Sequence, residues 1–151
     1  YALAIRYIHL THQLPLIMSQ DPLIWIIDDD DISKYVMKRY LKQLSASRIV
    51  DFPDSLQPLK FIQDNVNAIE DLPDVIFLDL HMPILNGFDF IKDFQQVASK
   101  INKKIKIVML TSSINAEDVE IAKSFPEISN YFIKPIKHRD LEKIMDDELN
   151  N

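Results

Sequence analysis

The chain of 151 residues contains no cysteine, so it has neither a disulfide framework nor a thiolate that could serve as nucleophile or metal ligand. This absence permits a reducing cytoplasm, which is the location that we expect. No segment approaches the run of about 20 apolar residues that a membrane span requires. We therefore expect a soluble protein that does not act in a membrane.

An excess of positive charge is also missing. Seventeen Lys and Arg residues stand against 23 Asp and Glu residues, for a formal net charge of -6, and the basic residues are scattered among the acidic ones. A protein that follows a nucleic-acid backbone needs a basic stripe on its surface. Direct DNA binding is therefore disfavoured.

Glycine is nearly absent, and the single one is Gly87. Because glycine allows backbone conformations and close approaches that other residues do not, its presence in so glycine-poor a sequence indicates a backbone need. A chance location is the alternative.

Apolar residues, by contrast, make up 47% of the chain, which is ample for one well-buried core at this length. We expect one domain over residues 21–149. Residues 1–20 differ from it, because their apolar clusters do not lead into a strand and lack the features of a secretory signal. Two interpretations are open for this extension: residues upstream of a natural start at Met18, non-native or disordered, or a short helix packed on the domain.

From Leu23 onward, short apolar runs alternate with segments of helical period, which is typical of strand–helix units around a parallel sheet. Five runs rich in Ile, Val or aromatic residues are the expected strands: 23–27, 48–52, 75–78, 105–110 and 131–133. The first and third are continuously apolar, as in strands covered on both faces, whereas the second contains charges and fits an edge.

Five apolar stripes at helical spacing predict five helices whose stripes face the core. The stripes are Ile32, Val36, Tyr40, Leu41 and Leu44; Leu59, Ile62 and Val66; Phe88, Ile91, Ala98 and Ile101; Val119, Ala122 and Phe125; and Leu141, Ile144 and Met145. Asp30 or Asp31, Asp54 and Asn115 stand where N-caps are expected. The pattern predicts a doubly wound α/β domain with a five-stranded parallel sheet in the flavodoxin-like order 2-1-3-4-5.

In such sheets ligands bind beyond the carboxyl ends of the strands, and four of the five expected ends are polar. These ends carry Asp28 and Asp29, then Asp79, Thr111 and Lys134, whereas the end at Phe52 carries no polar group. Three carboxylates around one crevice raise one another's proton affinity unless a cation compensates. Mg2+ suits a site with few protein ligands and room for phosphoryl oxygens. Calcium is disfavoured because no Asp-x-Asp-x-Asp-Gly loop is present.

Each of these residues also has a purely structural interpretation. The acidic run could be a solvated turn with an N-cap, Thr111 could cap the next helix, and Lys134 could be an ordinary surface residue. Asp79 could cap a loop, yet a carboxylate directly after the apolar run 75–78 is costly to place without a partner. The shared position at strand ends favours a site.

Four motifs, in this order, resemble the receiver domains of bacterial response regulators, over Leu23 to about Leu149. They are Ile26-Ile27-Asp28-Asp29-Asp30, Leu78-Asp79-Leu80-His81-Met82-Pro83 with Asn86-Gly87, Leu110-Thr111-Ser112-Ser113, and Ile133-Lys134-Pro135. The resemblance implies that Asp79 is the phosphoacceptor. It also implies that Asp28, Asp29, Asp79 and the backbone carbonyl of His81 hold the Mg2+ ion.

The same resemblance implies that Thr111 and Lys134 each contact a phosphoryl oxygen and that the Lys134–Pro135 peptide bond is cis. Phosphoryl transfer depends on positioning and charge neutralisation, which Mg2+ and a lysine supply. Tyr131 is expected to rotate inward with Thr111 and so to change the surface formed by residues 116–125, 131–133 and 138–147. Plain core filling is the alternative for Tyr131.

Two departures from the family pattern affect these expectations. Asn130 stands where relatives usually have a small residue, and the segment Phe125-Pro126-Glu127 replaces the usual Gly-Ala, so the shape of the output surface is not implied. His81 and Ser113 occupy positions that tune dephosphorylation in the family. Gly87 stands where the family turns into its third helix.

We therefore expect a stand-alone, CheY-like receiver of a two-component phosphorelay. A sensor histidine kinase or phosphotransfer protein would phosphorylate it, and an unidentified downstream protein would take the signal; a homodimer is left open. It would not be an enzyme beyond its own phosphorylation and autodephosphorylation. The alternatives are an interaction module that works without phosphorylation and a Mg2+-dependent hydrolase, for which no separate general base is evident.

Overall fold

The structure is a computed structural model that describes residues 21–149, with side chains to residue 147. The interpretation of residues 1–20 as an extension therefore lies outside the described residues. None of the helices within this range is long and apolar enough to cross a membrane.

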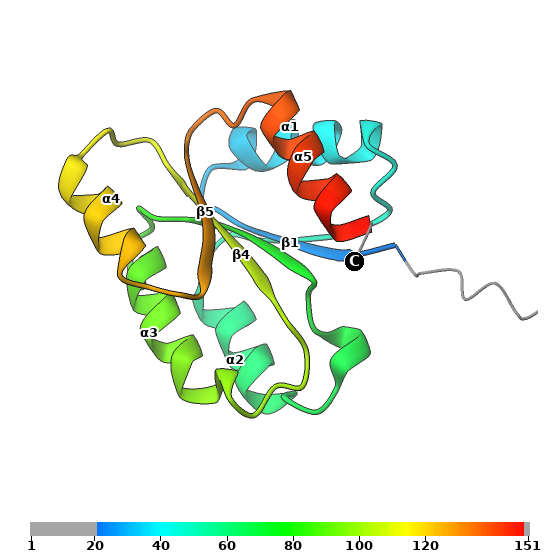
Figure 1. Cartoon of the computed structure of the whole chain (residues 1–151), viewed down its shortest axis with the longest axis vertical. Coiled ribbons are helices and arrows are strands. Elements are labelled where there is room, and N and C mark those ends of the chain that lie inside the picture. The colour runs from blue at the N-terminus through cyan, green and yellow to red at the C-terminus, as the bar shows by residue number, and fades with distance from the viewer. Residues whose placement is uncertain (1–20, 150–151) are drawn as a thin grey trace, which may run out of the picture.

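Five parallel strands form one sheet in the order β2-β1-β3-β4-β5, so the expected fold class and strand order are confirmed. The strands are β1 (Leu23–Ile27), β2 (Arg48–Phe52), β3 (Val75–Asp79), β4 (Lys106–Thr111) and β5 (Ile128–Ile133). The helices are α1 (Asp31–Gln43), α2 (Leu56–Asp64), α3 (Gly87–Ala98), α4 (Ala116–Lys123) and α5 (His138–Leu149), with a 3-10 turn at Ile69–Asp71. Figure 1 shows α1 and α5 on one face of the sheet and α2 and α3 on the other, with α4 beside β5.

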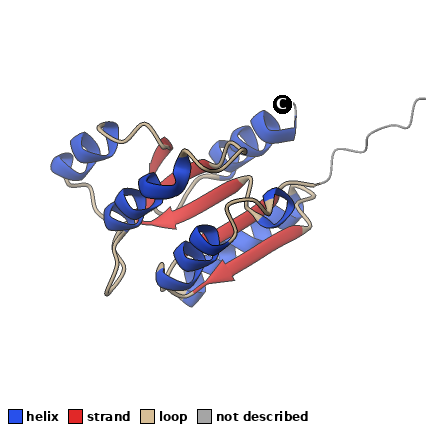
Figure 2. Ribbon diagram, turned by 90° about the horizontal axis from the view of Figure 1, so that it is seen from below, coloured by secondary structure: helices blue, strands red, loops and turns tan. Residues whose placement is uncertain are grey.

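Hydrophobic side chains of the sheet point alternately to two separate cores, one under each helix layer, and Figure 2 shows the strands between these layers. Trp25 and Ile27 of β1 face the layer of α2 and α3, whereas Ile24 and Ile26 face the layer of α1 and α5. All five residues of β1 and of β3 are buried, because helices cover both faces of these strands. This cover on both faces explains why the sequences of β1 and β3 are continuously apolar.

Four strand boundaries differ from the sequence-based expectation, one of them being the start of β4 at Lys106 rather than at residue 105. Asp79 is the last residue of β3 and Thr111 the last of β4, rather than the residues that follow, because ladder pairing continues to Leu110 and Ile133 respectively. Strand β5 begins at Ile128 instead of Tyr131. Its first half contains polar residues, which an edge strand tolerates because one side of it faces solvent.

The expected buried stripe of α1 is wrong in part. Ile32 is 74% exposed, and the buried residues of this helix are Lys34, Met37 and Leu41. Lys34 is 5% exposed, and its ammonium lies 2.9 Å from a carboxylate oxygen of Asp31, so the charge keeps a partner while the long apolar stem is buried. A sequence pattern that counts lysine as polar cannot detect this arrangement.

Polar side chains cap the N-termini of the helices by accepting hydrogen bonds from backbone N–H groups. Asp30 and Asn115 are the N-caps of α1 and α4, as expected, and accept hydrogen bonds from backbone N–H groups of the first turn. Asp54 also accepts from the first turn of α2, although Ser55 occupies the N-cap position itself. Asn86 caps α3 in the same way, a cap that the sequence interpretation missed.

Four of the expected stripes extend past the observed helix ends, at Leu44, Val66, Ile101 and Phe125. Ile101 and Phe125 still pack against the core next to α2 and α3, although they lie in the turns that follow α3 and α4. Apolar spacing therefore identified core residues better than it identified helix ends.

Candidate functional site

The carboxyl ends of β1, β3 and β5 bring charged side chains into one place. Asp28, directly after β1, is buried, and its Oδ1 accepts a hydrogen bond from the Asp30 backbone N–H at 2.9 Å. Its Oδ2 accepts from Ser33 Oγ at 2.7 Å and from Lys134 Nζ at 2.7 Å. These three donors fix the Asp28 carboxylate and tie β1, α1 and the end of β5 together.

Lys134 lies between two buried carboxylates. Its Nζ is 2.7 Å from Asp28 Oδ2 and 3.1 Å from Asp79 Oδ1. Burial alone would lower the pKa of Lys134, but the hydrogen bond to Asp28 and the charge of Asp79 outweigh burial and raise this pKa. Lys134 is therefore held as a cation between the ends of β1 and β3.

Asp79 remains incompletely compensated by these contacts. Burial raises the pKa of its carboxyl, Lys134 lowers it, and the neighbouring charge of Asp28 raises it further. Oδ1 of Asp79 is buried and accepts no hydrogen bond among the described residues, so its contact with Lys134 is an ion pair alone. The carboxylate has a free face for a further cation or for a reacting group.

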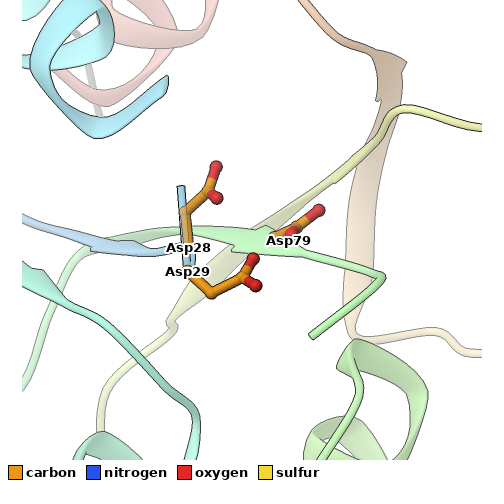
Figure 3. Close-up of side chains that lie close together, drawn as sticks. All are labelled: Asp28, Asp29 and Asp79. Atoms are coloured by element: carbon orange, nitrogen blue, oxygen red, sulfur yellow. The ribbon is translucent and has the colours of Figure 1, made fainter. Parts of the chain in front are cut away.

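Asp29 completes a group of three carboxylates. One oxygen each from Asp28, Asp29 and Asp79 lie within 4.8 Å of one another. In Figure 3 Asp28 and Asp29 leave the end of β1 in different directions, and the Asp29 carboxylate extends toward Asp79. Three carboxylates against the single ammonium of Lys134 leave two negative formal charges. An all-oxygen donor set with this charge fits a hard divalent cation such as Mg2+.

A cavity of about 420 Å³ opens beside two of these carboxylates, those of Asp29 and Asp79. Its polar end contains Asp29, Asp79, His81 and Lys134, and its walls continue along α1 and the segment after β5. Since α1 begins directly after the acidic run, the cavity lies beyond the carboxyl ends of the strands, where ligands of this fold class bind.

Thr111 lies at the end of β4, next to this cavity but not in its lining. It is fully buried, and its Oγ1 accepts a hydrogen bond from the Ser113 backbone N–H at 3.0 Å. The Lys134 backbone N–H donates to the Thr111 carbonyl at 2.7 Å, which fixes the ends of β4 and β5 beside each other. The peptide bond from Lys134 to Pro135 is cis.

Tyr131 of β5 extends its phenol toward Thr111 and the first turn of α4. Burial raises the pKa of this phenol, the Thr111 hydroxyl lowers it, and the Asp118 carboxylate raises it. The phenol oxygen is buried and has no well-aligned hydrogen-bond partner within the described part of the chain. Tyr131 therefore links the end of β4 to α4 without being fixed by a hydrogen bond.

His81 and Asp118 add a contact that sequence reasoning missed. His81 Nε2 lies 3.5 Å from Asp118 Oδ2, so the loop after β3 touches the first turn of α4. Ser33, whose hydroxyl holds Asp28, was also missed. Ser33 could have been suspected from its position in the first turn after the acidic run, whereas the contact of His81 with Asp118 joins the loop after β3 to α4 and leaves no local signal.

Gly87 stands at the start of α3, where the backbone passes close to the site. A Cβ atom added there would lie 2.9 Å from the Asp79 carbonyl oxygen and 2.9 Å from Met109 Sδ. Its φ angle is not positive, so the need for glycine is one of space rather than of left-handed backbone. The backbone of the phosphoacceptor candidate is thus packed directly against α3.

Residues 24–146 match the family model described as the response regulator receiver domain. Among curated proteins, the hybrid signal transduction histidine kinase D of Dictyostelium discoideum is 29% identical over 100 residues, which are 64% of this chain. The chain spans 6% of the length of that kinase. The chemotaxis protein CheY-3 of Vibrio cholerae is 23% identical over 130 residues, covering 86% of this chain and 93% of that protein.

Solved structures show the same fold at low sequence identity. A two-component response regulator from Cytophaga hutchinsonii superposes with a TM-score of 0.74 at 23% identity, covering 85% of this chain and 96% of the other. The receiver domain of the sensor histidine kinase PA1611 from Pseudomonas aeruginosa gives a TM-score of 0.67 at 20% identity, covering 86% and 98%. That crystal structure has a magnesium ion coordinated in the active site cleft.

Proposed function

The chain belongs to the response regulator receiver family of two-component signalling, and from this premise we propose that Asp79 accepts a phosphoryl group in the cytoplasm from a phosphohistidine donor. The observation that carries the proposal is the ion pair of Lys134 with Asp79, two residues that line the cavity, made while Lys134 also contacts Asp28. One ammonium placed between two buried carboxylates is suited to hold an incoming phosphoryl oxygen.

The chain's own residues divide the work of this transfer. An oxygen of Asp79 attacks phosphorus, and the bond from phosphorus to the donor nitrogen breaks. Lys134 neutralises a phosphoryl oxygen, and the Thr111 hydroxyl, whose oxygen already accepts from Ser113, donates its hydrogen to another. Rigid positioning is the main contribution, because each of these groups stands at a strand end.

A Mg2+ ion fits the three carboxylates, and Asp28, Asp29 and Asp79 would hold it together with the backbone carbonyl of His81. When bound, the ion supplies positive charge for the transferred oxygens. The two negative charges that Lys134 leaves uncompensated are the reason for expecting a divalent ion.

The chain acts as a signalling switch, and its only catalysis is its own phosphorylation and dephosphorylation. The partners that we propose are a sensor histidine kinase or phosphotransfer protein as donor and an unidentified protein as receiver of the signal. A relative named as a hybrid histidine kinase supports the first of these. The output face comprises α4, β5 and α5, where Tyr131 lacks a fixed hydrogen bond.

Incubation with radiolabelled acetyl phosphate and Mg2+ tests the proposal. We expect acid-stable, base-labile label on the parent chain, little label when EDTA replaces Mg2+, and at least a 100-fold loss of label in Asp79→Asn. Asp64→Asn is the matched control, because Asp64 is an exposed carboxylate paired with Lys60 and lies outside the site. Equal labelling of Asp79→Asn and the parent would show that Asp79 is not the acceptor.

A further inference from the structure

Ser33 lies next to the candidate site, and the proposed transfer gives it no part. It belongs to the first turn of α1, where its backbone N–H donates to the side chain of the N-cap Asp30 at 3.3 Å. Its own side chain lines the cavity beside Asp79, and its hydroxyl donates to Asp28 Oδ2 at 2.7 Å. Because the cap fixes the backbone at this point, the Ser33 hydroxyl is carried by a well-fixed part of the helix.

The two oxygens of the Asp28 carboxylate are used unequally. Oδ2 accepts from both the Ser33 hydroxyl and Lys134 Nζ, each at 2.7 Å, whereas Oδ1 accepts from the Asp30 backbone N–H at 2.9 Å. A carboxylate oxygen can accept about two hydrogen bonds, so the contacts of the described residues fill Oδ2 and leave capacity on Oδ1. The Ser33 and Lys134 donors thus determine which oxygen of Asp28 is available to a cation.

Lys134 is not a dedicated partner of Asp28. Its Nζ also lies 3.1 Å from Asp79 Oδ1, and the proposed transfer requires the same ammonium to neutralise a phosphoryl oxygen at Asp79. When the ammonium is engaged there, the Ser33 hydroxyl is the side-chain donor that remains on Asp28 Oδ2. Because Asp28 is buried, an oxygen without a donor would be costly, and the hydroxyl keeps the carboxylate in one orientation.

We propose that Ser33 is a positioning residue that holds the Asp28 carboxylate in its cation-binding orientation and thereby sets the affinity of the site for Mg2+. This inference rests on the proposed function, since it concerns the metal of the same site. It extends that function by giving a role to a side chain of α1 that acts through Asp28 rather than on the phosphoryl group. Hydrogen bonds to a metal-binding carboxylate typically change metal affinity by about 10- to 100-fold.

Titration of the full chain with MgCl2 tests this role without any phosphoryl transfer. The dissociation constant is obtained from the backbone amide NMR signals of Asp29 and Asp79. We expect Ser33→Ala to bind Mg2+ about tenfold more weakly than the parent, because Asp28 then lacks the hydroxyl that fixes it. Ser33→Thr keeps a hydroxyl, and its added methyl group has room because residue 33 lines the cavity. This variant is expected to bind Mg2+ within about twofold of the parent.

Ser47→Ala is the matched control. The Ser47 hydroxyl also donates to a carboxylate, that of Asp21, but these two residues precede β2 and β1 and therefore lie at the amino ends of the strands. Its Mg2+ affinity should equal that of the parent. A single cooperative urea transition in Ser33→Ala establishes that a weaker affinity does not come from unfolding.

The Mg2+ dependence of Asp79 labelling distinguishes positioning from a loss of reactivity. In Ser33→Ala the Mg2+ concentration that gives half of the maximal labelling rate should rise about tenfold. The rate at saturating Mg2+ should fall by less than about threefold, because the attacking carboxylate of Asp79 and the ammonium of Lys134 are both retained. A purely structural defect would lower the rate at saturating Mg2+ as well.

Two sets of outcomes separate the inference from the proposed function. If Ser33→Ala binds Mg2+ as tightly as the parent, or if Ser33→Thr binds it no better than Ser33→Ala, the hydroxyl does not position Asp28, and the phosphoacceptor proposal stands. If the folded parent chain neither binds Mg2+ nor becomes labelled at Asp79, both proposals are wrong.

Discussion

Helices α3 and α4 follow neighbouring strands that each end in a residue of the candidate site, yet the two helices are anchored very differently. Helix α3 buries Gly87, Phe90, Ile91 and Phe94, and its first residue touches the Asp79 backbone. Helix α4 buries only Ala122 among its eight residues. The phosphoacceptor candidate therefore stands on a fixed support, whereas the helix next to Thr111 is held weakly.

The weak attachment of α4 depends on a few contacts at its edges. Phe88 stacks on Phe125 with ring centroids 5.9 Å apart, and Gln95 Nε2 donates to the Glu127 carboxylate at 3.0 and 3.1 Å. The comparison indicates that the candidate site and the loosely held helix occupy separate parts of the fold. A rigid site can bind and position a phosphoryl group, while a loosely held helix can move in response.

Truncation of a core residue in each helix should give the largest difference. Phe90 is fully buried, so Phe90→Ala is expected to lower the free energy of unfolding by about 3–5 kcal/mol. Ile121 on α4 is 37% exposed, so Ile121→Ala should cost less than about 1 kcal/mol. Urea denaturation measures both, and similar losses in the two variants would contradict the unequal anchoring.

Removing the charge of Asp79 should raise the free energy of unfolding, an effect that is smaller than that of Phe90→Ala and opposite in sign. Since the folded pKa of Asp79 is raised above its ordinary value of 3.8, the folded state binds its proton more tightly than the unfolded state. Ionised Asp79 therefore destabilises the fold above its folded pKa, and stability returns as pH falls toward 3.8. In EDTA at pH 7, Asp79→Asn should be more stable than the parent by about 1 kcal/mol.

This difference should shrink as the parent is titrated below its folded pKa, and urea denaturation at pH 7 and near pH 4 measures it. Asp64→Asn, at an exposed ion pair, should change stability by less than about 0.5 kcal/mol at either pH. A loss of stability in Asp79→Asn at pH 7 would mean that Lys134 compensates the carboxylate fully.

The contact between α3 and the turn after α4 should have the smallest effect on global stability. Gln95→Ala removes an exposed hydrogen bond to Glu127 and should cost about 0.5 kcal/mol or less. Hydrogen exchange of α4 amides should nevertheless become faster, whereas exchange in α3 should not change. Gln96→Ala, on the same helix but directed to Asp93, is the control. Slower exchange in α4 than in α3 of the parent chain would refute the comparison.

The sequence was sufficient for the topology because the informative residues are local. Continuous apolar runs identified β1 and β3, and charges within Arg48–Phe52 correctly indicated an edge strand. The polar residues at strand ends could be selected because parallel strands bring their carboxyl ends to one edge. The strand order 2-1-3-4-5, expected for this fold class, is also the order that the family resemblance implies.

Other features depend on contacts between distant segments, and these could not be predicted. The burial of Lys34 depends on the tertiary fold, and the contact of His81 with Asp118 joins the loop after β3 to the first turn of α4. The start of β5 at Ile128 was missed because Ser129 and Asn130 are polar, and only the ladder with β4 shows that they belong to a strand. The cavity beside Asp79 also arises from α1, β4 and the segment after β5 together.

The central claim is that three strand ends assemble one phosphoacceptor site at Asp79, and chemical mapping of the acyl phosphate tests it most directly. After reaction with acetyl phosphate and Mg2+, borohydride reduces an aspartyl phosphate to homoserine, which mass spectrometry of peptides locates. We predict homoserine at position 79 alone, and none when EDTA replaces Mg2+. Homoserine at another aspartate, or its equal formation without the metal, would contradict the account.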